Sequence, residues 1–409
     1  MKKVKFITIL FIILPLLSIY KSFIYPLSLA DLAIMIIAIL SVIDTFINKS
    51  QRRYLLTKEK KYIHFAPLLF IILMIFTTLL SILVNGEVIV SSVIIRILRY
   101  ALFMYSVSVI GYKYFDSNYG AKLIVTISIV STVYIFIQTI VYYSTGVVLP
   151  FIIPFFDPVV SDYNDISGLI AWYNQFYYRP QSFFMEPAHF SQYNLVSLAL
   201  CLFWKEKFSE QNRIKTAIFL SIGLVLSTSS IGVILGLFIW SIYLMKSYRN
   251  KITHKKIVVF ILMFFVLIIL SPTILETQRI TVPIVRVFQT TARTTDSISL
   301  FEGLNIKQKI LGIGLGNEEV YLGIGTKIPF MNALTIVLLS AGYIGIFAYL
   351  ILFLSLFLYK KGLSKVLVIS LFILSFGSEV FFTYTGILWM LFIYYWNWNF
   401  NFSTRLTTK

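Results

Sequence analysis

The sequence predicts an all-α protein that crosses a membrane many times. Two observations predict this class: 58% of the 409 residues are hydrophobic and only 13% are charged, which gives a mean hydropathy of +0.87. Soluble domains carry about 25% charged residues and no more than about 50% apolar ones. The composition therefore excludes a soluble enzyme, a disordered chain and a nucleic-acid-binding domain.

A third observation is the set of long apolar stretches along the chain. A helix that spans a bilayer needs about 20 mostly apolar residues. Twelve stretches of roughly this kind can be drawn, of which the seventh, eighth, eleventh and twelfth are short or poorly separated. We expect about 12 transmembrane helices, over residues 4–20, 27–47, 65–84, 89–111, 122–143, 187–204, 214–227, 230–246, 257–275, 332–358, 366–380 and 383–397.

The basic residues predict which way these helices run. The chain has 35 Lys and Arg against 17 Asp and Glu, a formal net charge of +18. With both termini in the cytoplasm, 25 of the 35 basic residues fall on the cytoplasmic side and 8 on the outer side. This split follows the positive-inside rule and requires an even number of spans. The basic excess thus indicates topology, and we expect no nucleic-acid partner.

Two long connections, 144–186 and 276–331, both face outward in this topology. Long connections in compact domains commonly carry function, since short ones need only turn the chain. No repeat or linker divides the sequence, so we expect a single polytopic domain, 1–409. One cysteine and three widely separated histidines argue against a disulfide framework and a metal centre.

The first long connection ends in a motif that opens a helix. Five aromatic residues between positions 172 and 178 precede Arg179-Pro-Gln-Ser182-Phe-Phe-Met-Glu186-Pro187-Ala-His189. Proline suits the first position of a helix, which places Glu186 at the N-terminal end, where the dipole favours a carboxylate. Glu186 is therefore either a capping acid or, beside Arg179, a base that takes a proton from a sugar hydroxyl.

The Arg-x-x-Ser-x-x-x-Glu-Pro string resembles the Wzy-type polymerases of O-antigen, capsule and exopolysaccharide repeat units, which are related to the O-antigen ligases. The resemblance implies a GT-C-like architecture and a metal-independent glycosyltransferase without cofactor in the bacterial cytoplasmic (inner) membrane. Its substrate would be an undecaprenyl-diphosphate-linked oligosaccharide, and a chain-length regulator and a flippase are further partners that it suggests. The match supports Arg179, Ser182, Glu186 and Pro187 as carried-over positions. We expect catalytic roles for Glu186 and Arg179, and substrate contacts from Ser182 and from the nearby His189.

The second long connection supplies three arginines and a glycine run. Arg279, Arg286 and Arg293 are spaced by seven residues, so a helix would align them as a phosphate-binding face, or as a solvated or headgroup-facing surface. The run 309–317, Lys-Ile-Leu-Gly-Ile-Gly-Leu-Gly-Asn, lacks the βαβ context of a dinucleotide site. It resembles the Gly-x-Gly-x-Gly-Asn element of the polymerase and ligase superfamily, which implies a catalytic Arg293 and a substrate contact from Asn317. We expect its glycines to form a tight turn.

The alternatives are a ligase and a transporter. Ligases carry a histidine near the end of the second connection, where this chain has Met331, so a polymerase is favoured. The tryptophan that family members often carry after the catalytic Arg is absent from residues 294–300. A lipid-linked sugar flippase or other transporter would show inverted repeats, helices broken at the midplane and short loops on both faces.

Arg96 and Arg99 lie inside the fourth predicted span. They are three residues apart and so share a helix face. An Arg at the centre of a spanning helix costs about 2.5–3.5 kcal/mol on insertion scales, so each should face a cavity or an anionic partner. They either pair with Asp31, Asp44 or Glu379 or help to hold the pyrophosphate of a lipid carrier.

Overall fold

The computed structural model describes residues 2–24, 27–47, 61–85, 88–152, 156–159, 178–204, 209–248, 298–318, 320 and 331–396. Within these ranges the chain is mostly helical and forms no strand beyond two isolated β-bridges, Tyr20 to Pro158 and Lys21 to Ser28. The prediction of an all-α protein is confirmed for this part of the chain.

Every predicted apolar segment except 257–275 falls on an observed helix, and 257–275 lies outside the described residues. A π-helical stretch, η1, joins α5 and α6 into one continuous helix. The elements in chain order are α1 (Lys2–Leu17), α2 (Leu29–Ile47), α4 (Lys61–Asn85), α5 (Val90–Tyr105), η1 (Ser106–Gly111), α6 (Tyr112–Tyr114), α7 (Ser117–Thr145), α9 (Pro187–Phe203), α10 (Glu210–Leu226), α11 (Ser230–Tyr248), α15 (Ile306–Leu311), α17 (Ala333–Tyr359), α18 (Leu363–Gly377), the 3-10 helix η2 (Val380–Phe382) and α19 (Tyr384–Tyr395).

Several of these helices have the length and composition of membrane spans. Among the described residues, four helices are long and apolar enough to cross a bilayer, and three shorter ones are also apolar. Large hydrophobic side chains stand exposed on the outer faces of α2, α4 and α17, as in Ile47, Leu83 and Phe347. Apolar side chains on the outside of a helical bundle suit lipid, so the chain is membrane-embedded. The four long helices are Ala66–Val84, Val90–Tyr114, Ser117–Thr145 and Ala333–Tyr359.

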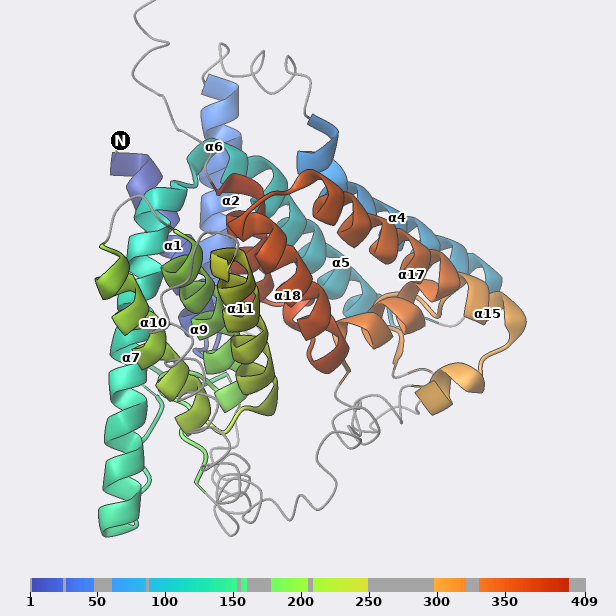
Figure 1. Ribbon diagram of the computed structural model, residues 1–409. Helices are drawn as coiled ribbons and strands as arrows, with labels where there is room; N and C mark the ends of the chain where they lie inside the picture. Colours follow the sequence, from blue (N-terminus) through green and yellow to red (C-terminus); the bar gives the residue numbers. More distant parts are fainter. Residues whose placement is uncertain are drawn as a thin grey trace, which may run out of the picture.

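Helix α9, which the Glu-Pro motif opens, is buried on almost every face. It packs against α7, α10, α11, α18 and α19 (Figure 1). Polar groups along it are bonded to these neighbours: Asn194 Nδ2 donates to the Leu220 carbonyl at 3.0 Å, and Trp389 Nε1 donates to the Gln192 carbonyl at 3.0 Å. Because these buried bonds would be costly to break, the start of α9 is a firmly held part of the fold.

The glycine run after α15 passes between α4, α5 and α17. Gly312, Gly314 and Gly316 have φ values of +82°, +90° and +79°, so each adopts the left-handed backbone that glycine allows. A Cβ at Gly316 would lie 2.8 Å from the Ser92 carbonyl oxygen, which leaves no space for a side chain. The prediction that these glycines form a tight turn is confirmed.

Helix α17 is broken where it meets this turn. Gly342 has φ +61° and ψ −154°, which no helical residue adopts, and it separates 333–341 from 343–359. A Cβ at Gly342 would lie 2.6 Å from the Lys309 carbonyl oxygen, so the two backbones cross in direct contact. Figure 1 shows α15 lying against α17 at this crossing, with α4 alongside.

Candidate functional site

The loop that leads into α9 is fixed to α7. Ser182, with a positive φ of 57°, is fully buried. Its N–H donates to Gln138 Oε1 at 2.9 Å and its hydroxyl donates to the Ser131 carbonyl at 2.8 Å. The Tyr178 ring stacks on Tyr142 with a centroid distance of 4.2 Å, and burial raises the pKa of the Tyr178 phenol well above its ordinary value. Ser182 thus holds the loop in place and does not open into a cavity.

Glu186 and Pro187 take the positions that the sequence predicts. Glu186 is the N-cap residue of α9 and Pro187 stands in its first turn. The Glu186 carbonyl accepts the N–H groups of His189 and Phe190 at 3.0 and 3.2 Å, while the carboxylate makes no capping hydrogen bond. Arg179 Nε donates to Thr228 Oγ1 at 3.3 Å, in the turn between α10 and α11. The motif from Arg179 to His189 therefore forms the loop before α9 and its first turn.

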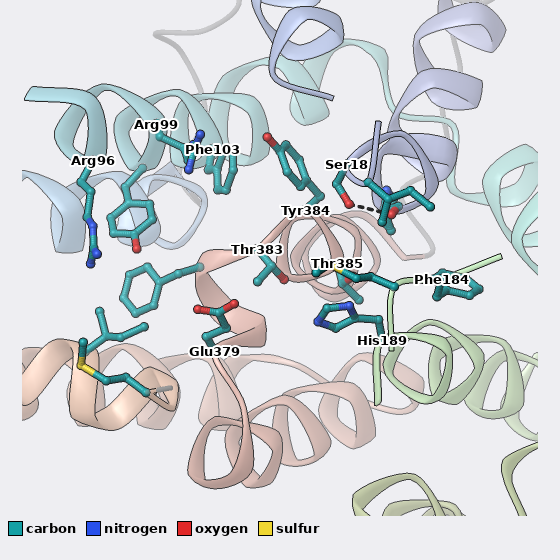
Figure 2. A pocket seen from close by; sticks show the side chains of 17 residues that line it. Ser18, Arg96, Arg99, Phe103, Phe184, His189, Glu379, Thr383, Tyr384 and Thr385 are labelled. Atoms are coloured by element: carbon teal, nitrogen blue, oxygen red, sulfur yellow. Dashed lines mark hydrogen bonds between the residues drawn. The ribbon is translucent and has the colours of Figure 1, made fainter. Parts of the chain in front are cut away.

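A cavity of about 430 Å³ lies next to the first turn of α9 (Figure 2). Its wall is assembled from the ends of several elements that are far apart in the sequence. These are the end of α1, the middle of α5, the loop before α9 with the first turn of α9, the start of α17, and η2 with the start of α19. Aromatic rings supply much of the surface, from Tyr100, Phe103, Phe184, Phe382 and Tyr384.

Two arginines of α5 line this cavity, and each has a buried acidic partner. Arg96 Nη1 lies 2.8 Å from Glu318 Oε1, and Arg99 Nε lies 3.3 Å from Asp31 Oδ1. The arginine side chains are 27% and 37% exposed, whereas their acidic partners are 1% and 8% exposed. The guanidinium groups can therefore be reached from the cavity and the carboxylates behind them cannot.

The second carboxylate oxygen of Asp31 is also hydrogen-bonded. Its Oδ2 accepts the Ser28 N–H at 3.0 Å and the Ser28 hydroxyl at 2.9 Å, and Arg99 Nη2 donates to it at 3.3 Å. The Ser28 hydroxyl in turn lies 3.1 Å from the Tyr384 hydroxyl. This network fixes the Arg99 guanidinium at the wall and leaves some of its N–H donors for a ligand.

A histidine and a glutamate, His189 and Glu379, also line the cavity. Neither side chain makes a hydrogen bond or ion pair with another described residue. Figure 2 shows the Glu379 carboxylate turned toward the middle of the cavity, with Thr383 beside it and the His189 ring farther along the wall. Arg96 and Glu379, which carry opposite charges, both line the cavity.

Asn317 and Glu318, at the end of the glycine run, support the wall from behind. Asn317 Oδ1 accepts the Ile89 N–H at 3.0 Å, just before α5 begins, and Asn317 Nδ2 donates to the Ile313 carbonyl at 3.2 Å. The Asn317 side chain is 1% exposed and does not line the cavity. Its predicted contact with substrate stays a prediction, and its position ties the glycine turn to α5.

The structure thus brings together three of the residues that the sequence singled out, Arg96, Arg99 and His189. It places Ser182 and Asn317 in supporting positions. Glu186 is the N-cap of α9 and Arg179 bonds to Thr228, and neither lines the cavity. Arg279, Arg286 and Arg293 lie outside the described residues.

The pairing of the α5 arginines was predicted in part. The suggested pair with Asp31 is present for Arg99, but Arg96 pairs with Glu318, which the sequence did not point to. Asp44 pairs with Lys3 and Lys113 instead. For Glu379 the sequence predicts only a role as a partner for the arginines, and its one signal is an acidic residue near the end of the apolar segment 366–380.

A scan of the sequence against protein-family models found no match, and a search among curated proteins found none either.

Proposed function

We propose that this protein is a polysaccharide repeat-unit polymerase, a membrane glycosyltransferase that joins undecaprenyl-diphosphate-linked oligosaccharides. The observation that carries the proposal is the cavity in which two arginines, a histidine, a carboxylate and several aromatic rings meet. Arginine binds diphosphate oxygens through pairs of N–H donors. Aromatic rings suit the apolar faces of sugar rings, and a carboxylate suits a hydroxyl that must lose its proton.

The helix ends around the cavity support the predicted topology. The cavity borders the C-terminal end of α1 and the N-terminal ends of α9, α17 and α19. With twelve spans and both termini in the cytoplasm, all four of these ends face outward, as do the connections 144–186 and 276–331. We therefore infer that the reaction takes place at the outer face of a bacterial cytoplasmic membrane, where a lipid carrier would present its sugar.

The reaction would use the arginines to stabilise the departing group. As the glycosidic bond breaks, negative charge grows on the lipid diphosphate, and preorganised N–H donors are most effective where charge develops. Arg96 and Arg99 are held in place by Glu318 and Asp31, so they would need little reorganisation. The exposed apolar side chains of the lipid-facing helices would accommodate the polyprenyl tail. Arg179 in the first connection, and Arg279, Arg286 and Arg293 in the second, remain the further candidates that the sequence suggests.

A transporter of lipid-linked sugars is a second candidate, because α17 is broken at Gly342. Broken helices are typical of transporters, where they line the substrate path. In this chain, however, the break is filled by the glycine turn 312–316, whose backbone bonds to the exposed carbonyls: the Ile313 N–H donates to Leu339 O at 2.7 Å and the Gly314 N–H to Ser340 O at 3.1 Å. The break is thereby occupied by protein, which favours the transferase.

The test is a deletion strain together with the purified protein in lipid vesicles. Loss of a polymerase should leave single repeat units on the final acceptor, whereas loss of a ligase should leave finished polymer on the lipid carrier. In vesicles that contain lipid-linked repeat units, the protein should produce a ladder of longer glycans. Movement of the lipid between leaflets with no elongation would instead indicate the transporter.

A further inference from the structure

The strongest unassigned feature of the cavity is the carboxylate of Glu379. The backbone around it is firmly held: the Glu379 carbonyl accepts the Phe382 N–H at 2.8 Å, and the preceding Ser378 carbonyl accepts the Ala333 N–H at 3.0 Å. Val380 and Phe381, which follow it, are buried at 0% and 1% exposure. A rigid turn therefore presents an exposed acidic side chain to the cavity (Figure 2).

Glu379 differs from the other acidic groups near the cavity. Asp31 and Glu318 lie behind the wall and neutralise Arg99 and Arg96. Glu379 lies on the wall itself, and its carboxylate makes no hydrogen bond or ion pair with another described residue. Glu379 is exposed and lines a cavity, so a substrate that enters the cavity can reach its carboxylate. Its oxygens are available to accept a proton.

We propose that Glu379 is the catalytic base that accepts the proton of the acceptor hydroxyl. The inference rests on the proposed polymerase function. In the step, the acceptor oxygen forms a bond to the anomeric carbon of the donor sugar while the bond from that carbon to the diphosphate oxygen breaks. The electron pair of the broken bond leaves with the lipid diphosphate, beside Arg96 and Arg99. The hydroxyl proton passes to the Glu379 carboxylate and from there to water.

The arrangement of charges in the cavity supports this role. The arginines lie on α5 and Glu379 lies between α18 and η2, so the positive and negative groups reach the cavity from different elements. A diphosphate bound at the arginines would leave the carboxylate free for the second substrate. The acid of the motif, Glu186, is less well placed, because its neighbours Met185 and His189 line the cavity but Glu186 itself does not.

The experiment compares Glu379→Gln with Glu186→Gln and with Glu302→Gln, a matched control at an exposed glutamate away from the cavity. Each variant is purified, checked for its unfolding midpoint, and assayed in vesicles for elongation of lipid-linked repeat units. Binding of undecaprenyl diphosphate is measured separately. General-base catalysis contributes about 100-fold to 10,000-fold, so Glu379→Gln should elongate at least about 100-fold more slowly.

Glu379→Gln should bind undecaprenyl diphosphate as tightly as the wild type or more tightly, because removal of a negative charge favours an anion. A structural defect would weaken both binding and elongation. If Glu379→Gln does not fold, Glu379→Asp, which keeps a carboxylate, should still elongate measurably, and a folded but inactive Glu379→Asp would overturn the proposal.

Wild-type elongation by Glu379→Gln together with loss of elongation in Glu186→Gln would overturn the role of Glu379 and leave the polymerase assignment intact. Absence of elongation by the wild-type protein, together with unchanged polymer in the deletion strain, would overturn the polymerase assignment and the role of Glu379 with it.

Discussion

Replacement of Arg96 by Gln should destabilise the protein as well as alter its cavity. Arg96 Nη1 lies 2.8 Å from Glu318 Oε1, and the Glu318 side chain is 1% exposed. The Oε2 atom of Glu318 is buried and has no hydrogen-bond partner among the described residues. Arg96→Gln would therefore leave a buried carboxylate without its cation, and removal of one partner of a buried ion pair costs about 3–5 kcal/mol.

The reverse change should cost less. The Arg96 side chain is 27% exposed and lines the cavity, so its charge keeps some contact with water when Glu318 is replaced. We expect about 1.5–3 kcal/mol for Glu318→Gln, the usual contribution of a hydrogen bond to a charged group. The double variant carries two neutral amides and no buried charge. It should regain about 2–3 kcal/mol relative to the sum of the single changes.

The assay is denaturant unfolding in detergent micelles, followed by tryptophan fluorescence, on the wild type, both single variants and the double variant. The double variant also separates stability from function. If it is stable but makes no polymer, Arg96 acts on the substrate. A free energy of unfolding for Arg96→Gln within about 0.5 kcal/mol of the wild type, the range of ordinary surface substitutions, would refute the reasoning about the buried pair.

Three further predictions concern residues that support the fold. Gly342→Ala should cost at least about 1–3 kcal/mol more than Gly362→Ala in unfolding experiments, because both have positive φ but only the Cβ at position 342 would meet backbone atoms; equal losses would contradict this. Ser182→Ala should lower stability by about 1–2 kcal/mol through loss of its bond to the Ser131 carbonyl, without weakening undecaprenyl diphosphate binding; weaker binding would assign it to the substrate. Burial lowers the pKa of Lys360 from 10.5 to about 8, so the folded state binds fewer protons between these values and stability should rise with pH in that window. Lys360→Met should reduce this rise in pH-dependent unfolding curves, and an unchanged slope would contradict the assignment.

Much of the fold could be predicted from the sequence because the length of an apolar segment is a local property. A stretch of about 20 apolar residues forms a helix in lipid whatever its neighbours are, since only a helix bonds all of its own backbone groups. The same holds for Pro187 at the start of α9 and for the glycines of the turn 312–316, where one residue type fits one backbone geometry. The sequence does not predict the break in α17 at Gly342, because the break depends on the crossing of the Lys309 backbone.

The site could be predicted only in part, because its residues come from distant parts of the sequence. The spacing of Arg96 and Arg99 predicts that they share a helix face, and their place inside a predicted span calls for a cavity or an anionic partner. The partners come from residues 222 and 68 positions away in the sequence. The motif drew attention to Glu186, whereas the acidic side chain that lines the cavity is Glu379, which lies in no motif. When two residues are this far apart in the sequence, their separation does not indicate whether their side chains are in contact.

The sequence by itself determined the helical class, the positions of the apolar helices and the local geometry at proline and glycine, because these depend on the physics of single segments. Only the tertiary structure decided which carboxylate pairs with which arginine and which remains open to the cavity. Burial of a charge is tolerated only beside an opposite charge, and that compensation is set by packing between helices rather than by order along the chain.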